Sequence, residues 1–277
     1  MSDQSATHRP AAVPGHSPFL STALEAAKAA AEVIRRYYQR NLEVVIKADK
    51  SPVTQADVET EKVIRGIIAE RFPAHGFYGE ETGQSAIEAE YLWLVDPIDG
   101  TKAFVREYPM FSTQIALMHR GRLIVGVSSA PVYGEIAYAQ LPHSVAGGQA
   151  YERIAVLNER ELHVSDIATI EGAAISGGNL KTLASGPQWA RYGQLVARVH
   201  RIRGYGDFLH YHLLAAGKIE AVIESDVNIL DIAALAVIVE AAGGKFTDLG
   251  GKPLGLQTTS VLAANAPMHP LVLAALS

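Results

Sequence analysis

The sequence predicts a mixed fold, an α+β first half followed by an α/β second half, in a chain of 277 residues. Two helical patterns precede a run of consecutive strands, and after about residue 162 strands alternate with helices. A chain of this length can bury a large core, and 48% hydrophobic and 19% charged residues are ordinary for a globular protein. We expect a flexible leader over 1–17, an N-terminal lobe over 18–160 and a C-terminal lobe over 161–277, packed as one compact unit.

The first half is expected to begin with helices and to continue with strands. Apolar residues recur at helical spacing over 18–38 and again from Thr54 to about residue 71, with a short strand expected over 41–47 between them. Strands separated by Gly, Pro and His are then expected in six segments: FYGEE, YLWLV, STQIALM, RLIVGVSSAP, GEIAYAQ and GGQAYE.

The second half is expected to alternate strands and helices. The strand segments are AAISGG, HRIRG and EAVIES, and the helix segments are PQWARYGQLVARV, DFLHYHLLAAG and DIAALAVIVEAAGG. No long linker separates the two halves, so we expect them to pack closely with a ligand site between them.

Composition excludes several classes of function. Without cysteine there is no disulfide framework, thiolate metal site or cysteine nucleophile, which suits a reducing cytoplasm. The net charge of −5 argues against broad binding to nucleic acid. No apolar stretch approaches the roughly 20 residues that span a bilayer, and the N-terminus lacks a secretory signal. We therefore expect a cytoplasmic protein with no nucleic-acid or membrane partner.

The stretch VDPIDGTKAF places Asp96 and Asp99 directly behind the apolar run YLWLV. Both aspartates are expected at the carboxyl end of a buried strand, where α/β sheets usually hold ligands, and Pro97 stiffens the link between them. Gly100 lets a ligand approach the backbone, and a helical turn opened at Thr101 offers N–H groups that suit a phosphate. A surface turn is the alternative, because Asp, Pro and Gly are turn residues.

Three further acids lie at similar points of the predicted fold. Glu80 in GEET ends another strand, Asp57 is near the start of the second helix, and Asp231 precedes the apolar helix in NILDIAAL. Singly, Glu80 and Asp57 are explained as solvated charges and Asp231 as a helix N-cap. Acids gathered at strand ends and helix starts are better explained together by hard cations, and the absence of cysteine and of neighbouring histidine favours magnesium over zinc.

These motifs resemble the inositol monophosphatase superfamily of magnesium-dependent phosphatases. GEET, DPIDGT and the aspartate before Ala233-Ala234 appear in the family's order, and the resemblance runs from about Leu20 to the C-terminus. It implies a layered α-β-α-β-α sugar-phosphatase-like fold, a small phosphorylated substrate and, commonly, a homodimer. The ligands that it implies for two or three magnesium ions are Glu80, Asp96, the backbone carbonyl of Ile98, Asp99 and Asp231.

The resemblance also implies catalytic roles near these ligands. Thr101 and Asp57 would orient and deprotonate the attacking water beside Glu80, and the N–H groups of Gly100 and Thr101 would hold the phosphate. Leu230 stands where the family usually has a tryptophan. This departure affects the wall of the site more than its metal ligands.

The second half favours one branch of the superfamily. Lys102 after the DGT motif resembles two branches, histidinol-phosphate phosphatases and 3′-phosphoadenosine nucleotide phosphatases. The Gly-Asp of RGYGDFLHYHLLAAGKIEAVIES resembles the histidinol-phosphate branch. Asp207 and Glu224 are then expected to face the cationic leaving group, and Arg203 to steady the phosphate or a partner acid. The ordinary alternatives are a surface charge for Lys102 and Arg203, an N-cap for Asp207, and wall or core positions for Tyr205, His210 and His212.

Two other interpretations stay open. The substrate is alternatively an inositol phosphate, fructose 1,6-bisphosphate or a 3′-phosphoadenosine nucleotide, which other branches hydrolyse. Some superfamily members also act as RNA-polymerase-associated regulators. The complete set of metal-ligand acids favours an enzyme.

Overall fold

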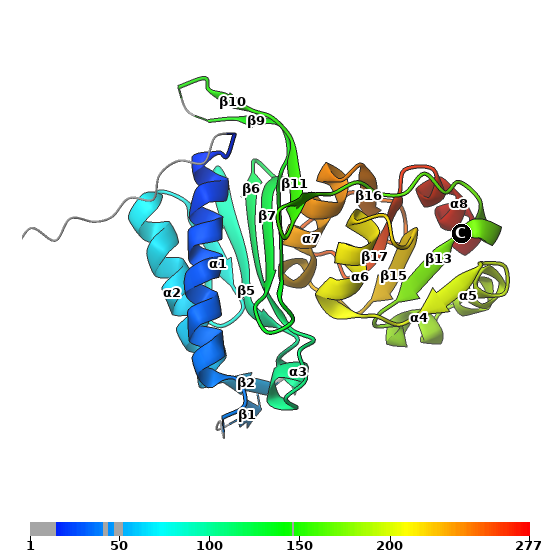
Figure 1. The fold of residues 1–277 in the computed structure, drawn as a ribbon, viewed down its shortest axis with the longest axis horizontal. Coiled ribbons are helices and arrows are strands. Elements are labelled where there is room, and N and C mark those ends of the chain that lie inside the picture. Colours follow the sequence, from blue (N-terminus) through cyan, green and yellow to red (C-terminus); the bar gives the residue numbers. More distant parts are fainter. Residues whose placement is uncertain (1–14, 41–43, 47–51, 146) are drawn as a thin grey trace, which may run out of the picture.

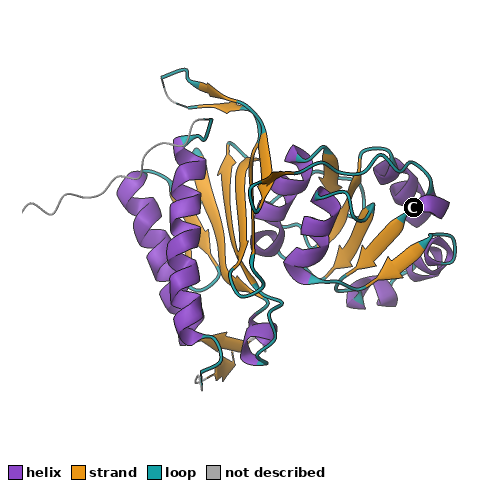
Figure 2. Cartoon of the chain, in the orientation of Figure 1, coloured by secondary structure: helices purple, strands orange, loops and turns teal. Residues whose placement is uncertain are grey.

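The chain forms five layers in which helices alternate with two β-sheets (Figure 1, Figure 2). The computed structural model describes residues 15–40, 44–46, 52–145 and 147–277. The expected leader therefore lies outside the described residues apart from 15–17, and the expected strand over 41–47 is described only over 44–46. The predicted α-β-α-β-α arrangement is confirmed, whereas the boundary between lobes near residue 160 stays a prediction.

The first layer is a pair of helices, α1 (Pro18–Tyr37) and α2 (Gln55–Arg71), which covers one face of the larger sheet (Figure 1). Both were expected from the sequence. The α1 helix starts where the Ser17 side chain accepts the N–H of Leu20 and Pro18 fills the first turn. Its buried face is rich in alanine, so the helix lies close to the sheet.

The second layer is an eight-stranded sheet of order β12-β11-β8-β7-β6-β5-β3-β4, antiparallel except for the parallel pair β3–β5. Its strands are β3 (Gly76–Gly79), β4 (Gly83–Ser85), β5 (Tyr91–Asp99), β6 (Ser112–His119), β7 (Arg122–Ala130), β8 (Glu135–Gln140), β11 (Ile154–Leu157) and β12 (Arg160–Glu161). Two small ribbons accompany it, β1 (Val44–Ile46) with β2 (Pro52–Thr54) and β9 (His143–Ser144) with β10 (Ala150–Tyr151).

The middle layer, α6 (Asp207–Ala215) and α7 (Ile229–Ala241), lies between the two sheets (Figure 2). Eleven of the 13 residues of α7 are buried, as expected for a helix covered on both sides. Gly126 of β7 permits this contact, because a Cβ atom there would lie 2.4 Å from the carbonyl oxygen of Ala234.

The last two layers are a five-stranded sheet and its outer helices. The sheet has the order β14-β13-β15-β17-β16, with β13 (Ala174–Gly177), β14 (Arg201–Arg203), β15 (Ala221–Ser225), β16 (Gly244–Thr247) and β17 (Ser260–Asn265). The helices are α4 (Lys181–Ser185), α5 (Trp189–Val196) and α8 (Met268–Leu276), with a 3₁₀ turn at Ile170–Gly172. The alternation of strands and helices expected from 174 to 241 is confirmed.

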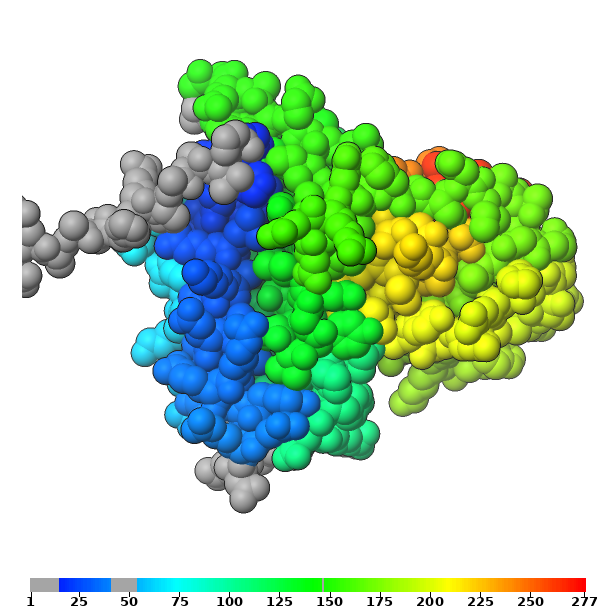
Figure 3. All heavy atoms as spheres, viewed as in Figure 1, coloured from blue at the N-terminus to red at the C-terminus, as the bar shows by residue number. Residues whose placement is uncertain are grey.

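The two halves of the chain meet along a broad front, where residues drawn in green adjoin those in yellow (Figure 3). A hydrophobic core of α6 and α7 with both sheets joins them. None of the described helices is long and apolar enough to cross a membrane.

Candidate active site

The strand β5 carries both aspartates of the DPIDGT motif and extends four residues beyond the predicted apolar run, to Asp99. Asp96 pairs with Gln114 and Asp99 pairs with Ser112. The chain therefore advances three residues on β5 but only two on β6, which is a β-bulge. In a regular strand, residues three apart point to opposite faces, and this bulge brings the two carboxylates together. Asp96 Oδ1 accepts the N–H of Ile98 at 3.0 Å, which fixes its orientation.

Glu80 lies beside Asp96 because β3 and β5 are parallel neighbours. Gly79 pairs with Val95, and the N–H of Glu80 donates to the carbonyl of Val95 at 3.2 Å. The loop after Glu80 is held by buried Glu61 of α2, whose two carboxylate oxygens accept the N–H groups of residues 81 and 82, each at 2.7 Å. A Cβ atom at Gly79 would lie 2.5 Å from the Glu61 carboxylate, so any other residue there would displace this carboxylate.

Asp231 reaches the same region from the first turn of α7. It is not the N-cap that the sequence suggested, because the helix begins at Ile229 and Asn228 is the N-cap. Asp231 occupies the third helical position, where its oxygens accept the backbone N–H of Asn228 at 2.9 Å and its side-chain amide at 2.7 Å. This capping box fixes the carboxylate before any ligand arrives.

Asp96, Asp99 and Asp231 form the acid cluster: each offers a carboxylate oxygen, and these oxygens lie within 4.8 Å of one another. Burial and the charges of Glu80 and of the other two aspartates raise the pKa of Asp96 well above its ordinary value. Burial also raises the pKa of Asp99, and that of Asp231 to about 7. The cluster therefore holds negative charge only at a considerable electrostatic penalty.

Asp57 and Thr101 contact each other beside the acid cluster. The Thr101 hydroxyl lies 3.2 Å from Asp57 Oδ1 and 3.1 Å from the carbonyl oxygen of Ile98. Asp57 is fully buried rather than on a solvated face, and its Oδ2 accepts the N–H and the hydroxyl of Thr54 at 2.8 and 2.7 Å. Burial raises its pKa, although these hydrogen bonds oppose the shift.

Thr101 opens the short helix α3 (Thr101–Val105), as expected, and Gly100 is its N-cap with φ of +90°. A Cβ atom at Gly100 would lie 2.7 Å from the carbonyl oxygen of Met110, so the turn requires glycine. The neighbouring Lys102 is exposed.

The two acids expected to recognise the substrate lie close to the cluster. The charges of Asp207 and Glu224 both raise the pKa of Asp99, after burial and the charge of Asp231. Asp207 is the first residue of α6 and Gly206 is the N-cap, so the alternative of an N-cap aspartate is wrong. Glu224 is the penultimate residue of the buried strand β15 and is 4% exposed.

Arg203 is at the exposed edge strand β14, where its guanidinium donates to the carbonyl of Ile202. Among the described residues it forms no ion pair with an acid, so the expectation of a partner acid is not met; a role toward phosphate stays a prediction. Leu230 is buried at the second position of α7. His210 and His212 are buried, as the core interpretation expected.

Three residues around the site were not foreseen, because long-range contacts define their places. Glu61 had a local signal: it lies four residues after Asp57 on one helix face. Ser176 and Tyr211 had none, since both meet the site only through pairing and packing of the five-stranded sheet.

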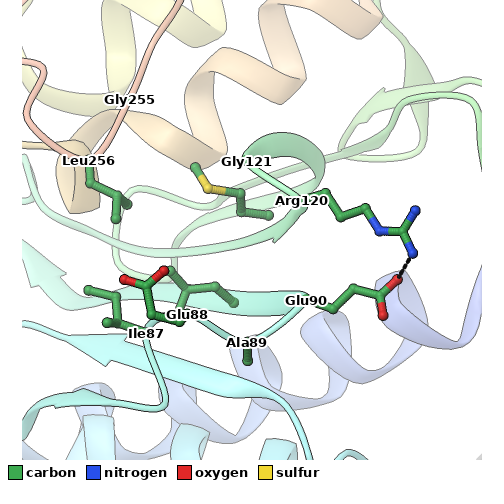
Figure 4. A pocket seen from close by; sticks show the side chains of 10 residues that line it. Ile87, Glu88, Ala89, Glu90, Arg120, Gly121, Gly255 and Leu256 are labelled. Atoms are coloured by element: carbon green, nitrogen blue, oxygen red, sulfur yellow. Dashed lines mark ion pairs between the residues drawn. The ribbon is translucent and has the colours of Figure 1, made fainter.

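A separate pocket of about 410 Å³ lies at the opposite end of β5 (Figure 4). Apolar side chains such as Leu92 and Met118 line it, and Arg120 and Glu90 at its edge form an ion pair of 2.8 Å. It contains none of the residues of the acid cluster.

The donor set of the acid cluster fits a hard cation. Three carboxylates from two elements converge, and their repulsion is offset when a divalent cation binds between them. Oxygen ligands alone suit magnesium-like ions better than zinc.

Comparison with known proteins agrees with this geometry. The family model described as "Inositol monophosphatase family" matches residues 16–277. A histidinol-phosphatase of Mycobacterium tuberculosis is 36% identical over 259 residues, covering 93% of this chain and 97% of the relative. The Nus factor SuhB of Pseudomonas aeruginosa is 33% identical over 264 residues, covering 90% and 92%.

Solved structures give the same result. The crystal structure of extragenic suppressor protein suhB from Bartonella henselae superimposes with a TM-score of 0.81 at 29% identity, covering 94% of this chain and 99% of that chain. The layered fold and the acid cluster thus define a phosphatase. The chain belongs to the inositol monophosphatase family.

Proposed function

We propose that the protein is a magnesium-dependent phosphomonoesterase that hydrolyses histidinol phosphate to histidinol and phosphate. The observation that carries the choice of substrate is the second pair of acids, Asp207 and Glu224, whose charges reach Asp99 of the acid cluster. Histidinol carries an amine and an imidazole that can both be positive, whereas inositol carries only hydroxyls. The histidinol-phosphatase relative supports the same substrate.

Two or three magnesium ions would bind here, as the family resemblance implies. Their ligands would be Glu80, Asp96, the backbone carbonyl of Ile98, Asp99 and Asp231. Bound there, it would lower the pKa of a water and neutralise charge that develops on the phosphate and leaving oxygens.

The chain's own residues direct the water and the ester. The Thr101 hydroxyl, 3.2 Å from Asp57 Oδ1, can accept a proton from water while passing its own to the aspartate. Asp57 cannot turn away, because Thr54 holds its other oxygen. The backbone N–H groups of Gly100 and Thr101 would hold the phosphate at the start of α3.

Glu224 keeps its charge for recognition. Burial alone would raise its pKa, but the contact with His210 and the hydrogen bonds from Tyr211 and the N–H of Asn179 lower it below the ordinary value. Asp207 is an exposed residue, but protein atoms partly surround its carboxylate. This partial burial and the charge of Glu224 raise the pKa of Asp207. A cation placed between these acids would relieve their repulsion.

Phosphate release from a panel of esters tests the proposal. We expect histidinol phosphate to give the highest kcat/KM, against inositol phosphate, fructose 1,6-bisphosphate, 3′-phosphoadenosine nucleotide and glycerol 2-phosphate, and a chelator to abolish turnover. Equal rates across the panel would reject the substrate, and full turnover in chelator would reject the metal.

The acid pair makes its own prediction. Asp207→Asn should lower kcat/KM for histidinol phosphate by about ten- to a hundred-fold, because a charge-assisted contact is lost, and leave glycerol 2-phosphate nearly unchanged. Since Asp207 caps nothing with its side chain, the asparagine should not weaken α6. Equal losses on both esters would place Asp207 in the scaffold instead.

The Nus factor relative keeps a second role open, a regulatory protein without catalysis. The acid cluster favours an enzyme, since convergent carboxylates weaken a fold unless they bind something. We also expect a homodimer in the cytoplasm, which light scattering and fractionation of source cells would test.

A further inference from the structure

Ser176 and His210 form a buried polar chain between the loop that carries Asp207 and the carboxylate of Glu224. Ser176 lies on β13 and His210 on α6, and both side chains are 0% exposed. Neither residue touches the acid cluster in any hydrogen bond of the described structure. Buried polar groups of this kind need a structural or functional reason, because they could otherwise be apolar.

Three close contacts connect the two ends of this buried polar chain. The backbone N–H of Tyr205 donates to Ser176 Oγ at 3.2 Å, and the same oxygen lies within hydrogen-bond distance of His210 Nδ1, also at 3.2 Å. On the other edge of the ring, His210 Nε2 lies 3.2 Å from Glu224 Oε2. His210 Nε2 has no hydrogen-bond partner among the described residues, so the ring meets Glu224 through this close contact.

The Glu224 carboxylate is fixed on its other sides as well. The Tyr211 hydroxyl donates to Oε2 at 2.5 Å, and the N–H of Asn179 donates to Oε1 at 3.0 Å. A Cβ atom at Gly178 would lie 1.8 Å from Oε1, so the backbone approaches the carboxylate as closely as glycine allows. The carboxylate therefore has one orientation.

The loop at the Ser176 end of the buried polar chain has a strained backbone. Asp207 has φ of +45°, a left-handed conformation that residues other than glycine rarely adopt. Such a conformation persists only where surrounding contacts impose it. The hydrogen bond from the Tyr205 N–H to Ser176, two residues earlier, is such a contact.

We propose that Ser176 and His210 are positioning residues that hold the Asp207 loop and Glu224 at a fixed separation, so that the two acids together select a phosphate ester with a cationic leaving group. This inference rests on the proposed function, because it assumes that the acids receive the leaving group. Neither residue would touch the reacting atoms. Their loss should therefore weaken binding of the cationic ester without slowing the chemistry of a small neutral one.

The test compares kcat and KM of Ser176→Ala and His210→Asn on histidinol phosphate and glycerol 2-phosphate. The two variants interrupt the chain at different points, so one remains informative if the other fails to fold. We expect KM for histidinol phosphate to rise about tenfold while kcat stays within about twofold, and both constants for glycerol 2-phosphate to change by less than about twofold.

His269→Asn is the matched control. His269 is also a buried histidine bonded to a hydroxyl of the five-stranded sheet, since its Nε2 lies 2.9 Å from Thr247 Oγ1, but it belongs to the outer helix α8. Its variant should keep the wild-type ratio of kcat/KM for the two esters. A changed ratio in this variant would show that any buried histidine alters selectivity and would overturn the assignment.

The outcomes separate the inference from the function beneath it. A wild-type protein without preference for histidinol phosphate rejects the proposed function. A wild-type preference that Ser176→Ala and His210→Asn retain rejects the positioning role alone. Equal losses on both esters also reject it, because they indicate a general structural defect.

Discussion

Asp57 and Asp231 each occupy the third position of a helix and each closes a capping box, with Thr54 and Asn228 respectively. A cap of this kind stabilises a helix by about 1 kcal/mol and fixes the carboxylate in one rotamer. The same side chains contribute to the candidate site, so helix capping positions them in advance. Because both residues stand in the first turn of a helix, the sequence alone also allowed a solvated charge for Asp57 and an N-cap for Asp231.

Thr101 provides the sharpest test at the residue scale. Thr101→Ala should lower kcat by roughly 10²–10⁴-fold, the usual contribution of a positioned proton-transfer group. KM and melting temperature should change little, because Asp57 keeps its two bonds to Thr54. Steady-state kinetics check this, and Thr101→Ser, which keeps the hydroxyl, should retain most activity. Normal turnover in the alanine variant would remove Thr101 from the mechanism.

Residues of the site differ in how far the sequence could reveal them. The aspartates of DPIDGT stand in one local motif, and their convergence was predictable from it. The bulge that aligns them was not, because it depends on the pairing of β5 with β6. Ser176 and His210 are 34 residues apart in sequence and meet only in the folded chain.

At the scale of elements, α2 organises the loop that follows β3. Glu61 accepts two backbone N–H groups of this loop and is fully buried. Glu61→Gln removes the charge and replaces one acceptor by a donor, which leaves one N–H unsatisfied. We predict a loss of about 1–3 kcal/mol in unfolding free energy and weaker magnesium binding, because Glu80 precedes the loop.

Urea unfolding and calorimetric magnesium titration measure the two effects of Glu61→Gln. The matched control is Glu59→Gln in the same helix, since Glu59 contacts Arg36 and Tyr37 on another side. An unchanged magnesium affinity in the Glu61 variant, with a control that behaves as wild type, would show that the loop keeps its shape without Glu61.

A stack of rings joins the end of α2 to β5. His75 stacks on Phe72 and Tyr91, each with ring centroids 4.7 Å apart, and its Nδ1 accepts the indole N–H of Trp93 at 3.1 Å. Burial lowers the pKa of His75 to about 4, although the charge of Glu90 opposes the shift. The neutral ring is therefore part of the folded structure.

The sign of this shift gives a pH prediction. In the unfolded chain histidine titrates near pH 6.5, so the unfolded state binds more protons between about pH 6.5 and pH 4. The contribution of His75 to stability is present above that range and is lost as pH falls through it. His75→Phe keeps the stack and leaves Trp93 unpaired, so it should be less stable at neutral pH but lose less stability on acidification. Melting temperatures of both proteins, measured in chelator at neutral and at acidic pH, check this prediction. An equal fall in melting temperature for wild type and His75→Phe would contradict it.

The elements themselves were predictable where a long periodic pattern existed. The helices α1, α2 and α7 agree with the sequence prediction to within a few residues. The strands β16 and β17 and the helix α8 were missed, because short apolar runs such as those near residue 262 do not distinguish strand from helix. Their assignment depends on contacts with segments remote in sequence, since β17 pairs with β15 and with β16, and α8 packs against β17.

At the scale of the whole molecule, the acid cluster links pH to stability. Its carboxyl groups ionise near pH 4 in an unfolded chain. In the folded chain, burial and mutual charge raise the pKa of Asp96 and Asp99 well above that value and that of Asp231 to about 7. The metal-free protein therefore binds more protons than the unfolded chain in this range, and the corresponding stability is lost as pH rises through the folded pKa values.

A divalent cation binds the ionised carboxylates, so magnesium should raise the melting temperature more near pH 8 than near pH 6. Near pH 6 the cation must displace protons that already relieve the repulsion, whereas near pH 8 it relieves the repulsion itself. Melting curves in chelator and in magnesium chloride measure the gain, with sodium chloride at equal ionic strength to correct for screening. Asp96→Asn should reduce the magnesium-dependent gain because it removes a ligand. Equal gains at both pH values, or an undiminished gain in Asp96→Asn, would place the bound cation outside the acid cluster.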